Sequence, residues 1–145
     1  MDATVEALRR ETGQFFRRHW NVDACGCNPP EWRSTPARFT GSVPCHDMGG
    51  CYALVEGGVV VYIGLGASHG GGLYPEHGIS RRLLKHAIRQ DSEGRCEPQT
   101  KWSSVTEIWT IGFGHDLKYI ALALEDYLIG SLGPRENAAK KRRHG

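Results

Sequence analysis

Apolar residues near the start of the chain recur with the spacing of an amphipathic helix. Between residues 3 and 20, Val5, Leu8, Phe15, Phe16 and Trp20 can share one broad apolar face. Arginines occupy the opposite side of the same stretch. This spacing predicts an N-terminal helix over residues 3–20 that packs its apolar face against the rest of the protein.

The next segment, residues 21–48, has no sustained hydrophobic period. It is rich in Pro, Gly, Ser and Thr, which are typical of turns and loops. A connection of this length without secondary structure is unusual in a compact domain. We therefore predict an irregular arm that lies over the domain, and the sequence leaves open whether short strands or turns occur within it.

Two strand-like runs follow, at residues 51–56 and 59–64, and Gly57-Gly58 separates them. Two glycines between such runs indicate a hairpin, because the favoured hairpin turns need positive φ. A third strand is predicted over 103–113, and helices over 79–90 and 117–132. This β-β-α-β-α order predicts an α+β fold with a small three-stranded antiparallel sheet flanked by helices. The N-terminal helix and arm span 1–48, and the main domain spans 49–145.

Composition adds little to this picture except by exclusion. The chain has 145 residues, no apolar run long enough to cross a bilayer and no apolar core of a signal peptide near its start, so we expect a soluble cytoplasmic protein without a membrane partner. Five cysteines without a secretory signal are expected to be reduced thiols. The net charge is only +2, but several short segments are basic and suit a phosphate backbone. Either a monomer or a homodimer is compatible with the sequence.

The helix predicted at 79–90 contains cationic residues at helical spacing. Arg82, His86 and Arg89 fall on one face, while leucines face the core. The guanidinium of arginine fits phosphate oxygens, and histidine can move a proton near neutral pH. A phosphate-facing pair is one interpretation of this face, and an ordinary solvated surface is the other.

The helix predicted at 117–132 is apolar apart from two carboxylates. Its core stripe is interrupted by Glu125 and Asp126. A carboxylate there is either at the solvated edge of the helix or a ligand for a hard cation such as Mg²⁺. Asn137 follows in a loop or at a helix cap, where asparagine is common.

Taken in order, these residues resemble the GIY-YIG nuclease family over residues 49–140. Gly50-Cys51-Tyr52 looks like the first triplet, with Cys in place of Ile or Val, and Tyr62-Ile63-Gly64 looks like the second after nine intervening residues. Each triplet alone is a weak signal. The ordered set is specific, and the resemblance implies that the catalytic residues are Tyr52, Tyr62, Arg82, His86, Glu125 and Asn137.

The resemblance implies a metal-dependent DNA endonuclease that hydrolyses phosphodiester bonds with one Mg²⁺ or Mn²⁺ ion. Glu125 would bind the ion, Arg82 would neutralise the growing charge on the phosphate, and Tyr62 would take the proton of the attacking water. A free phenol titrates near ~10, so Tyr62 would need cationic help. His86 would assist Tyr62 or orient the phosphate, and Asn137 would tie the final loop to the helix of Glu125.

Two departures from the family pattern concern the DNA-binding surface. Many members have a lysine directly after the second triplet, where this chain has Leu65, and we expect Leu65 to anchor the root of the glycine-rich loop instead. That loop, 66–78, is longer than in the repair nucleases of the family. The residues expected to contact nucleic acid are Arg82, Lys85, Arg89, His69 and His77. Of these, His69, His77 or Lys85 is expected to replace the absent cation.

Three alternatives accompany this interpretation. The first is a nucleic-acid-binding module on the same fold that has weakened chemistry because Leu65 replaces lysine. The second is a nucleotide-binding protein, since the glycine loop follows a strand, but the loop lacks the Gly-Lys-Ser/Thr ending of a phosphate loop. The third is a zinc site in the arm built from Cys25, Cys27, Cys45 and His46, whose spacing is tighter than in structural zinc sites.

Overall fold

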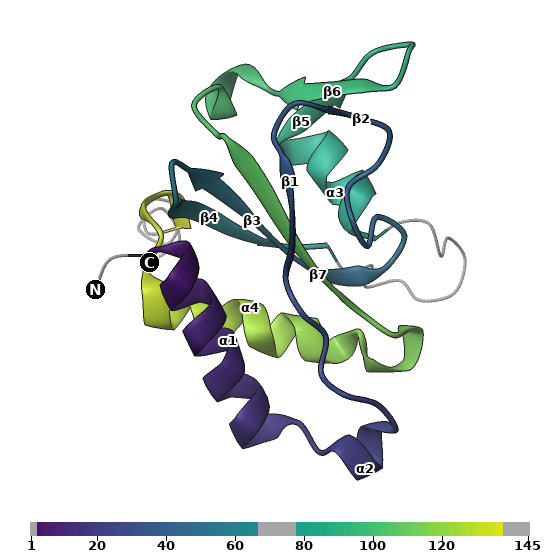
Figure 1. Cartoon of the computed structure of the whole chain (residues 1–145), viewed down its shortest axis with the longest axis vertical. Helices are drawn as coiled ribbons and strands as arrows, with labels where there is room; N and C mark the ends of the chain where they lie inside the picture. The colour runs from purple at the N-terminus through teal and green to yellow at the C-terminus, as the bar shows by residue number, and fades with distance from the viewer. Residues whose placement is uncertain (1–2, 67–77, 138–145) are drawn as a thin grey trace.

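The computed structural model describes residues 3–66 and 78–137 and has a mixed α+β architecture (Figure 1). Two antiparallel sheets are flanked by helices. The helices are α1 (Val5–His19), α2 (Val22–Cys25), α3 (Ile79–His86) and α4 (Tyr119–Leu132), with 3-10 turns η1 (Thr100–Trp102) and η2 (His115–Leu117). The strands are β1 (Arg33–Pro36), β2 (Phe39–Thr40), β3 (Gly49–Glu56), β4 (Val59–Leu65), β5 (Ile88–Gln90), β6 (Arg95–Pro98) and β7 (Glu107–Phe113).

The main sheet has four strands in the order β1-β7-β3-β4, rather than the three that the sequence predicts. The predicted strands are β3, β4 and β7, and the fourth, β1, comes from the arm. It pairs antiparallel with β7, from Arg33 opposite Thr110 to Pro36 opposite Glu107. Most side chains of β1 are exposed, so this strand is held by backbone pairing and not by burial of its side chains. Its sequence therefore shows no hydrophobic period.

The second sheet, with the order β2-β6-β5, is absent from the prediction. It corrects the helix predicted at 79–90, because α3 ends at His86 and residues 88–90 form a strand. Ala87 already has a non-helical φ of −133°. The backbone N–H and C=O groups of β5 find their hydrogen-bond partners on β6, whereas in a longer helix they would have bonded within the helix.

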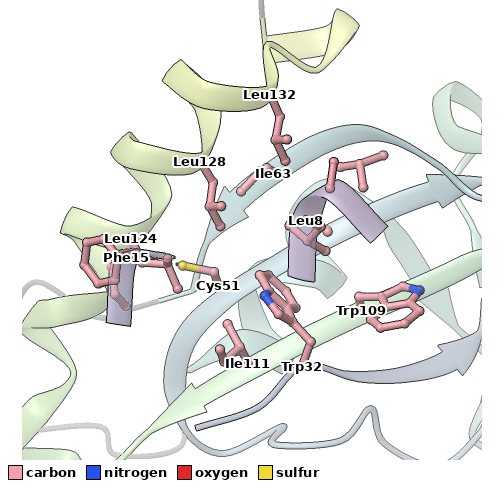
Figure 2. Packing of buried hydrophobic residues seen from close by; sticks show 14 of the residues in the cluster. Leu8, Phe15, Trp32, Cys51, Ile63, Trp109, Ile111, Leu124, Leu128 and Leu132 are labelled. Atoms are coloured by element: carbon pink, nitrogen blue, oxygen red, sulfur yellow. Dashed lines mark hydrogen bonds between the residues drawn. The ribbon is translucent and has the colours of Figure 1, made fainter. Parts of the chain in front are cut away.

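Two hydrophobic clusters occupy the two faces of the main sheet. Helices α1 and α4 cover one face, and α3 with the second sheet covers the other (Figure 1). Figure 2 shows Leu124, Leu128 and Leu132 pointing from α4 toward Cys51 and Ile63 of the sheet. The predicted apolar faces of the first and last helices are thereby confirmed, and the N-terminal segment shares its core with the rest of the chain.

Local signals in the sequence account for the ends of both long helices. The side chain of Thr4 accepts a hydrogen bond from the backbone N–H of Ala7 and so caps α1. Gly133 ends α4 in the left-handed conformation, with φ 56°. In the portion of the chain that the structure describes, no helix combines the length and the apolar character needed to cross a membrane.

Candidate active site

The hairpin of β3 and β4 contains a β-bulge that sets the direction of Tyr62. Gly57 and Gly58 form the turn, both with positive φ as predicted. The pairing then shifts between Leu54 and Val55, where Val61 is the extra residue. Without this bulge the two-residue turn would direct Tyr62 to the face covered by α1 and α4, because side chains alternate along a strand. With it, the two site tyrosines share the face covered by α3.

The glycine of the second triplet makes room for the first tyrosine. Tyr52 lies opposite Gly64 in the hairpin. A Cβ atom at Gly64 would overlap the Tyr52 ring, at 2.6 Å from its Cε1 atom. The packing of Tyr52 therefore requires glycine at position 64. The Tyr52 side chain reaches across β4, which is an edge strand of the sheet.

Tyr52 lies within electrostatic reach of three other predicted site residues. Its side chain is buried, with 1% exposure. Burial raises the pKa of Tyr52 well above its usual value, and the neighbouring Tyr62, the charge of Glu125 and a hydrogen bond with Tyr62 raise it further. Arg82 acts in the opposite direction. The fold thus brings Tyr52, Tyr62, Arg82 and Glu125 into one cluster, in which Tyr52 keeps its proton at neutral pH.

A buried thiol fixes the helix of Glu125 against the first triplet. Cys51 Sγ donates a hydrogen bond to the backbone oxygen of Ala121 at 3.2 Å. The pKa of Cys51 is raised well above its usual value by burial and then by the charge of Glu125, while a hydrogen bond with the Glu125 backbone lowers it. Cys51, which stands where the family has Ile or Val, therefore stays neutral and contacts the turn of α4 that carries Glu125.

Arg82 and His86 lie one turn apart on α3, as predicted, and both are exposed. An unpredicted residue connects this helix to Tyr62. Trp102 donates its indole N–H to the backbone oxygen of His86 at 2.9 Å, and its ring centroid lies 5.3 Å from that of Tyr62. Trp102 sits in a short 3-10 turn without periodicity, so the sequence contains no signal that would have identified it.

Asn137 fixes the edge strand at the second triplet. Its Oδ1 atom accepts from the N–H of Ile63 at 2.8 Å, and its Nδ2 atom donates to the Ile63 oxygen at 2.9 Å. The side chain is buried, with 6% exposure. The sequence predicted that Asn137 ties the final loop to the helix of Glu125, but its side chain pairs with the backbone of Ile63 on β4. Asn137 thus acts as a positioning residue for the strand that carries Tyr62.

The predicted nucleic-acid contacts are only partly brought together. Arg89 lies on β5, not on the face of α3, and its Nε atom is 2.8 Å from Glu97 Oε1. The hydrogen bond with Arg89 is the main cause that lowers the pKa of Glu97, and Arg38 lowers this pKa to a smaller extent. Lys85 is exposed on α3. The predictions for His69 and His77 fall outside the described residues.

Glu125 provides the hard oxygen donor of the cluster. Mg²⁺ usually binds through one or two carboxylates together with waters and substrate phosphates. Within residues 3–66 and 78–137, no group of three or more His, Cys, Asp or Glu side chains comes together. These residues do not form an all-protein cage for an ion, and a single ion at Glu125 would need water or substrate oxygens as further ligands.

The zinc site considered for the arm does not form in the part of the chain that the structure describes. Cys25, Cys27, Cys45 and His46 all belong to the described part of the chain, and they are not gathered as a group of metal ligands. The five cysteines are unpaired. The arm contributes β1 and β2 to the two sheets instead.

Leu65 packs against the cluster formed by α1, α4 and the sheet, and it lies opposite Cys51 in the hairpin. We expect Leu65→Lys to lower the free energy of unfolding by about 1–2 kcal/mol, because an ammonium group would replace an apolar side chain at a half-buried position. Thermal unfolding followed by circular dichroism measures this change.

The matched control for this substitution is Leu65→Met, which preserves volume and should cost less than about 1.5 kcal/mol. A Leu65→Lys protein as stable as the wild type, with faster cleavage, would contradict the packing role and show that the site merely lacks a cation.

No protein-family model, curated protein or solved structure matches this chain at a significant level. The functional interpretation therefore depends on the residues of the site and on their arrangement.

Proposed function

We propose that this chain is a metal-dependent DNA endonuclease of the GIY-YIG type, which hydrolyses phosphodiester bonds. The observation that supports this proposal most strongly is the cluster of Tyr52, Tyr62, Arg82 and Glu125, which come from two strands and two helices. Three of these side chains change the pKa of the fourth, so they lie close together despite their separation in sequence.

The two tyrosines are suited to different roles. Tyr52 is buried and keeps its proton, so its hydroxyl can donate a hydrogen bond but cannot accept a proton from water. Tyr62 is half-buried, and in its phenolate form its oxygen is the better candidate to take the proton of the attacking water. Trp102 and the Asn137 contact to Ile63 would hold Tyr62 in one orientation.

The remaining residues bind and neutralise the phosphate. Arg82 presents a planar guanidinium that can donate two hydrogen bonds to phosphate oxygens as negative charge grows there. His86, one turn further along α3, can orient the same phosphate. Glu125 would hold one Mg²⁺ or Mn²⁺ ion, which when bound supplies Lewis-acid polarisation of a phosphoryl oxygen.

The direct test is cleavage of supercoiled plasmid by the purified protein, with Mg²⁺ or with EDTA. We expect nicked DNA with Mg²⁺ only, and a loss of rate of about a hundredfold for Arg82→Ala, because one stabilising group for the transition state is removed. Arg81→Ala is the matched control, since it removes the same charge from the neighbouring position of α3 and should stay within about threefold of the wild type.

Equal cleavage by all three proteins, or cleavage in EDTA, would point to a contaminating nuclease and refute the proposal. Tight DNA binding without any cleavage would favour the second candidate, a nucleic-acid-binding module with weakened chemistry. The observation that favours this second candidate is Leu65, which occupies the family's lysine position and packs into the core.

A further inference from the structure

A groove of about 690 Å³ lies between α1 and the arm, away from the tyrosine cluster. One wall is the face of α1 that contains Arg9, Gly13 and Arg17, and the opposite wall is formed by residues 29–32 of the arm. Figure 1 shows this part of the arm as the connection from α2 to β1. The size falls in the range of ligand-binding clefts, and none of the residues discussed for cleavage lines it.

The groove is lined by apolar and aromatic side chains, and the indole N–H groups of its two tryptophans already have hydrogen-bond acceptors within the protein. Trp20 and Trp32 donate their indole N–H groups to the Cys27 oxygen and to Thr12 Oγ1, at 2.9 and 2.8 Å. Trp20 is half-buried and Val22, also in the lining, is 48% exposed. Trp20 is therefore the ring that is accessible to a ligand, and because its N–H is already bonded it offers apolar ring surface, which suits stacking.

Two arginines give the groove its charge. Arg9 and Arg17 are both exposed, and their positions on the helix are separated by about 12 Å along its axis. Arg9 lies over the Trp109 ring at 5.4 Å, and in the described part of the chain neither arginine forms an ion pair. Glu31 is the single acidic side chain among the lining residues, all of which are described.

We propose that this groove binds a single strand of nucleic acid, with phosphates at Arg9 and Arg17 and bases against Trp20 and the adjacent prolines. The separation of the arginines corresponds to three or four stacked nucleotides at about 3.4 Å each. A duplex presents mainly phosphates and buried bases, so it would leave the aromatic wall unused. The choice of DNA over RNA as the ligand rests on the proposed function.

The test is binding of a fluorescein-labelled dT12 oligonucleotide to the full chain in EDTA, followed by fluorescence anisotropy over a range of salt concentrations. EDTA separates binding from cleavage. We expect Arg17→Glu to weaken binding by about tenfold or more and to reduce the slope of log affinity against log salt by about 0.7, the value for one lost contact to a single strand.

Arg18→Glu is the matched control, because it makes the same charge reversal in the same last turn of α1 at a position outside the groove. It should weaken binding less than about threefold, because the Arg18 side chain does not line the groove and so makes no direct contact with a strand bound there. If Arg17→Glu does not fold, Arg17→Gln tests the same contact and should still lose affinity.

Equal losses for Arg17→Glu and Arg18→Glu, or absent binding of dT12 by the wild type, would overturn the proposal. So would tighter binding of a labelled twelve-residue polyglutamate peptide, which would identify an acidic protein as the occupant. Plasmid cleavage without dT12 binding would refute single-strand binding in the groove and leave the proposed nuclease activity intact. Binding of dT12 that depends on Arg17, without plasmid cleavage, would support single-strand binding in the groove and refute the nuclease activity.

Discussion

Replacement of Glu125 by Gln should reduce Mg²⁺-dependent plasmid cleavage by about a thousandfold or more. The substitution keeps the shape of the side chain and removes the one charged oxygen donor of the tyrosine cluster. A metal-assisted reaction derives several kcal/mol of transition-state stabilisation from its ion, and about 4 kcal/mol corresponds to this factor. Initial rates of nicking over a Mg²⁺ titration measure the loss.

Stability should change little in the Glu125→Gln variant, because the substitution keeps the size of a half-buried side chain. Asp126→Asn is the matched control. It makes the same chemical change at the next position of α4, where the side chain is exposed, and should cleave at a rate close to that of the wild type. Near-normal cleavage by Glu125→Gln would remove Glu125 from the site.

Removal of the Tyr62 hydroxyl is expected to have the second large effect on the cleavage rate. Tyr62→Phe keeps the ring that packs on Trp102, and it should slow cleavage by about a thousandfold, within the range attributed to general bases. The substitution also removes the hydrogen-bond partner of the buried Tyr52 hydroxyl, so we expect a loss of about 1 kcal/mol in the free energy of unfolding. Single-turnover cleavage with excess protein separates this loss from weaker DNA binding.

Tyr52→Phe serves as the paired comparison, because Tyr52 is the buried and protonated member. We expect a smaller loss of rate, about tenfold, together with about 1 kcal/mol of lost stability from a removed buried hydrogen bond. If Tyr52→Phe is the slower enzyme, the assignment of the base must move to Tyr52.

Elements with a strong side-chain period were predictable from the sequence. The apolar faces of α1 and α4 and the double-glycine hairpin occur where expected, because burial of side chains and positive φ at Gly57 and Gly58 leave direct signals. Strands β1, β2, β5 and β6 were not predicted. All four strands have only two to four residues, too few to show a side-chain period. In addition, β1 and β2 pair with strands that are distant in sequence, and such pairing leaves no local pattern.

The residues of the site could be selected from the sequence, but their spatial arrangement could not. A two-residue hairpin without a bulge would have separated Tyr52 from Tyr62, and nothing in the run of valines at 59–61 indicates the extra residue. The role of Gly64 depends on the position of the Tyr52 ring across the hairpin. Contacts of Trp102 and Asn137 likewise arise from long-range packing that a single sequence does not encode locally.

The contact between Asn137 and Ile63 makes completion of the site depend on the direction of protein synthesis. The two residues are 74 positions apart, and Glu125 also follows both tyrosine strands. A ribosome-bound chain can form the hairpin long before it contains Glu125 or the amide that pairs with the hairpin's outer strand. The nascent protein therefore has an incomplete site and an open hydrogen-bonding edge until residue 137 has left the exit tunnel, and delay at that stage exposes the edge to pairing with neighbouring nascent chains.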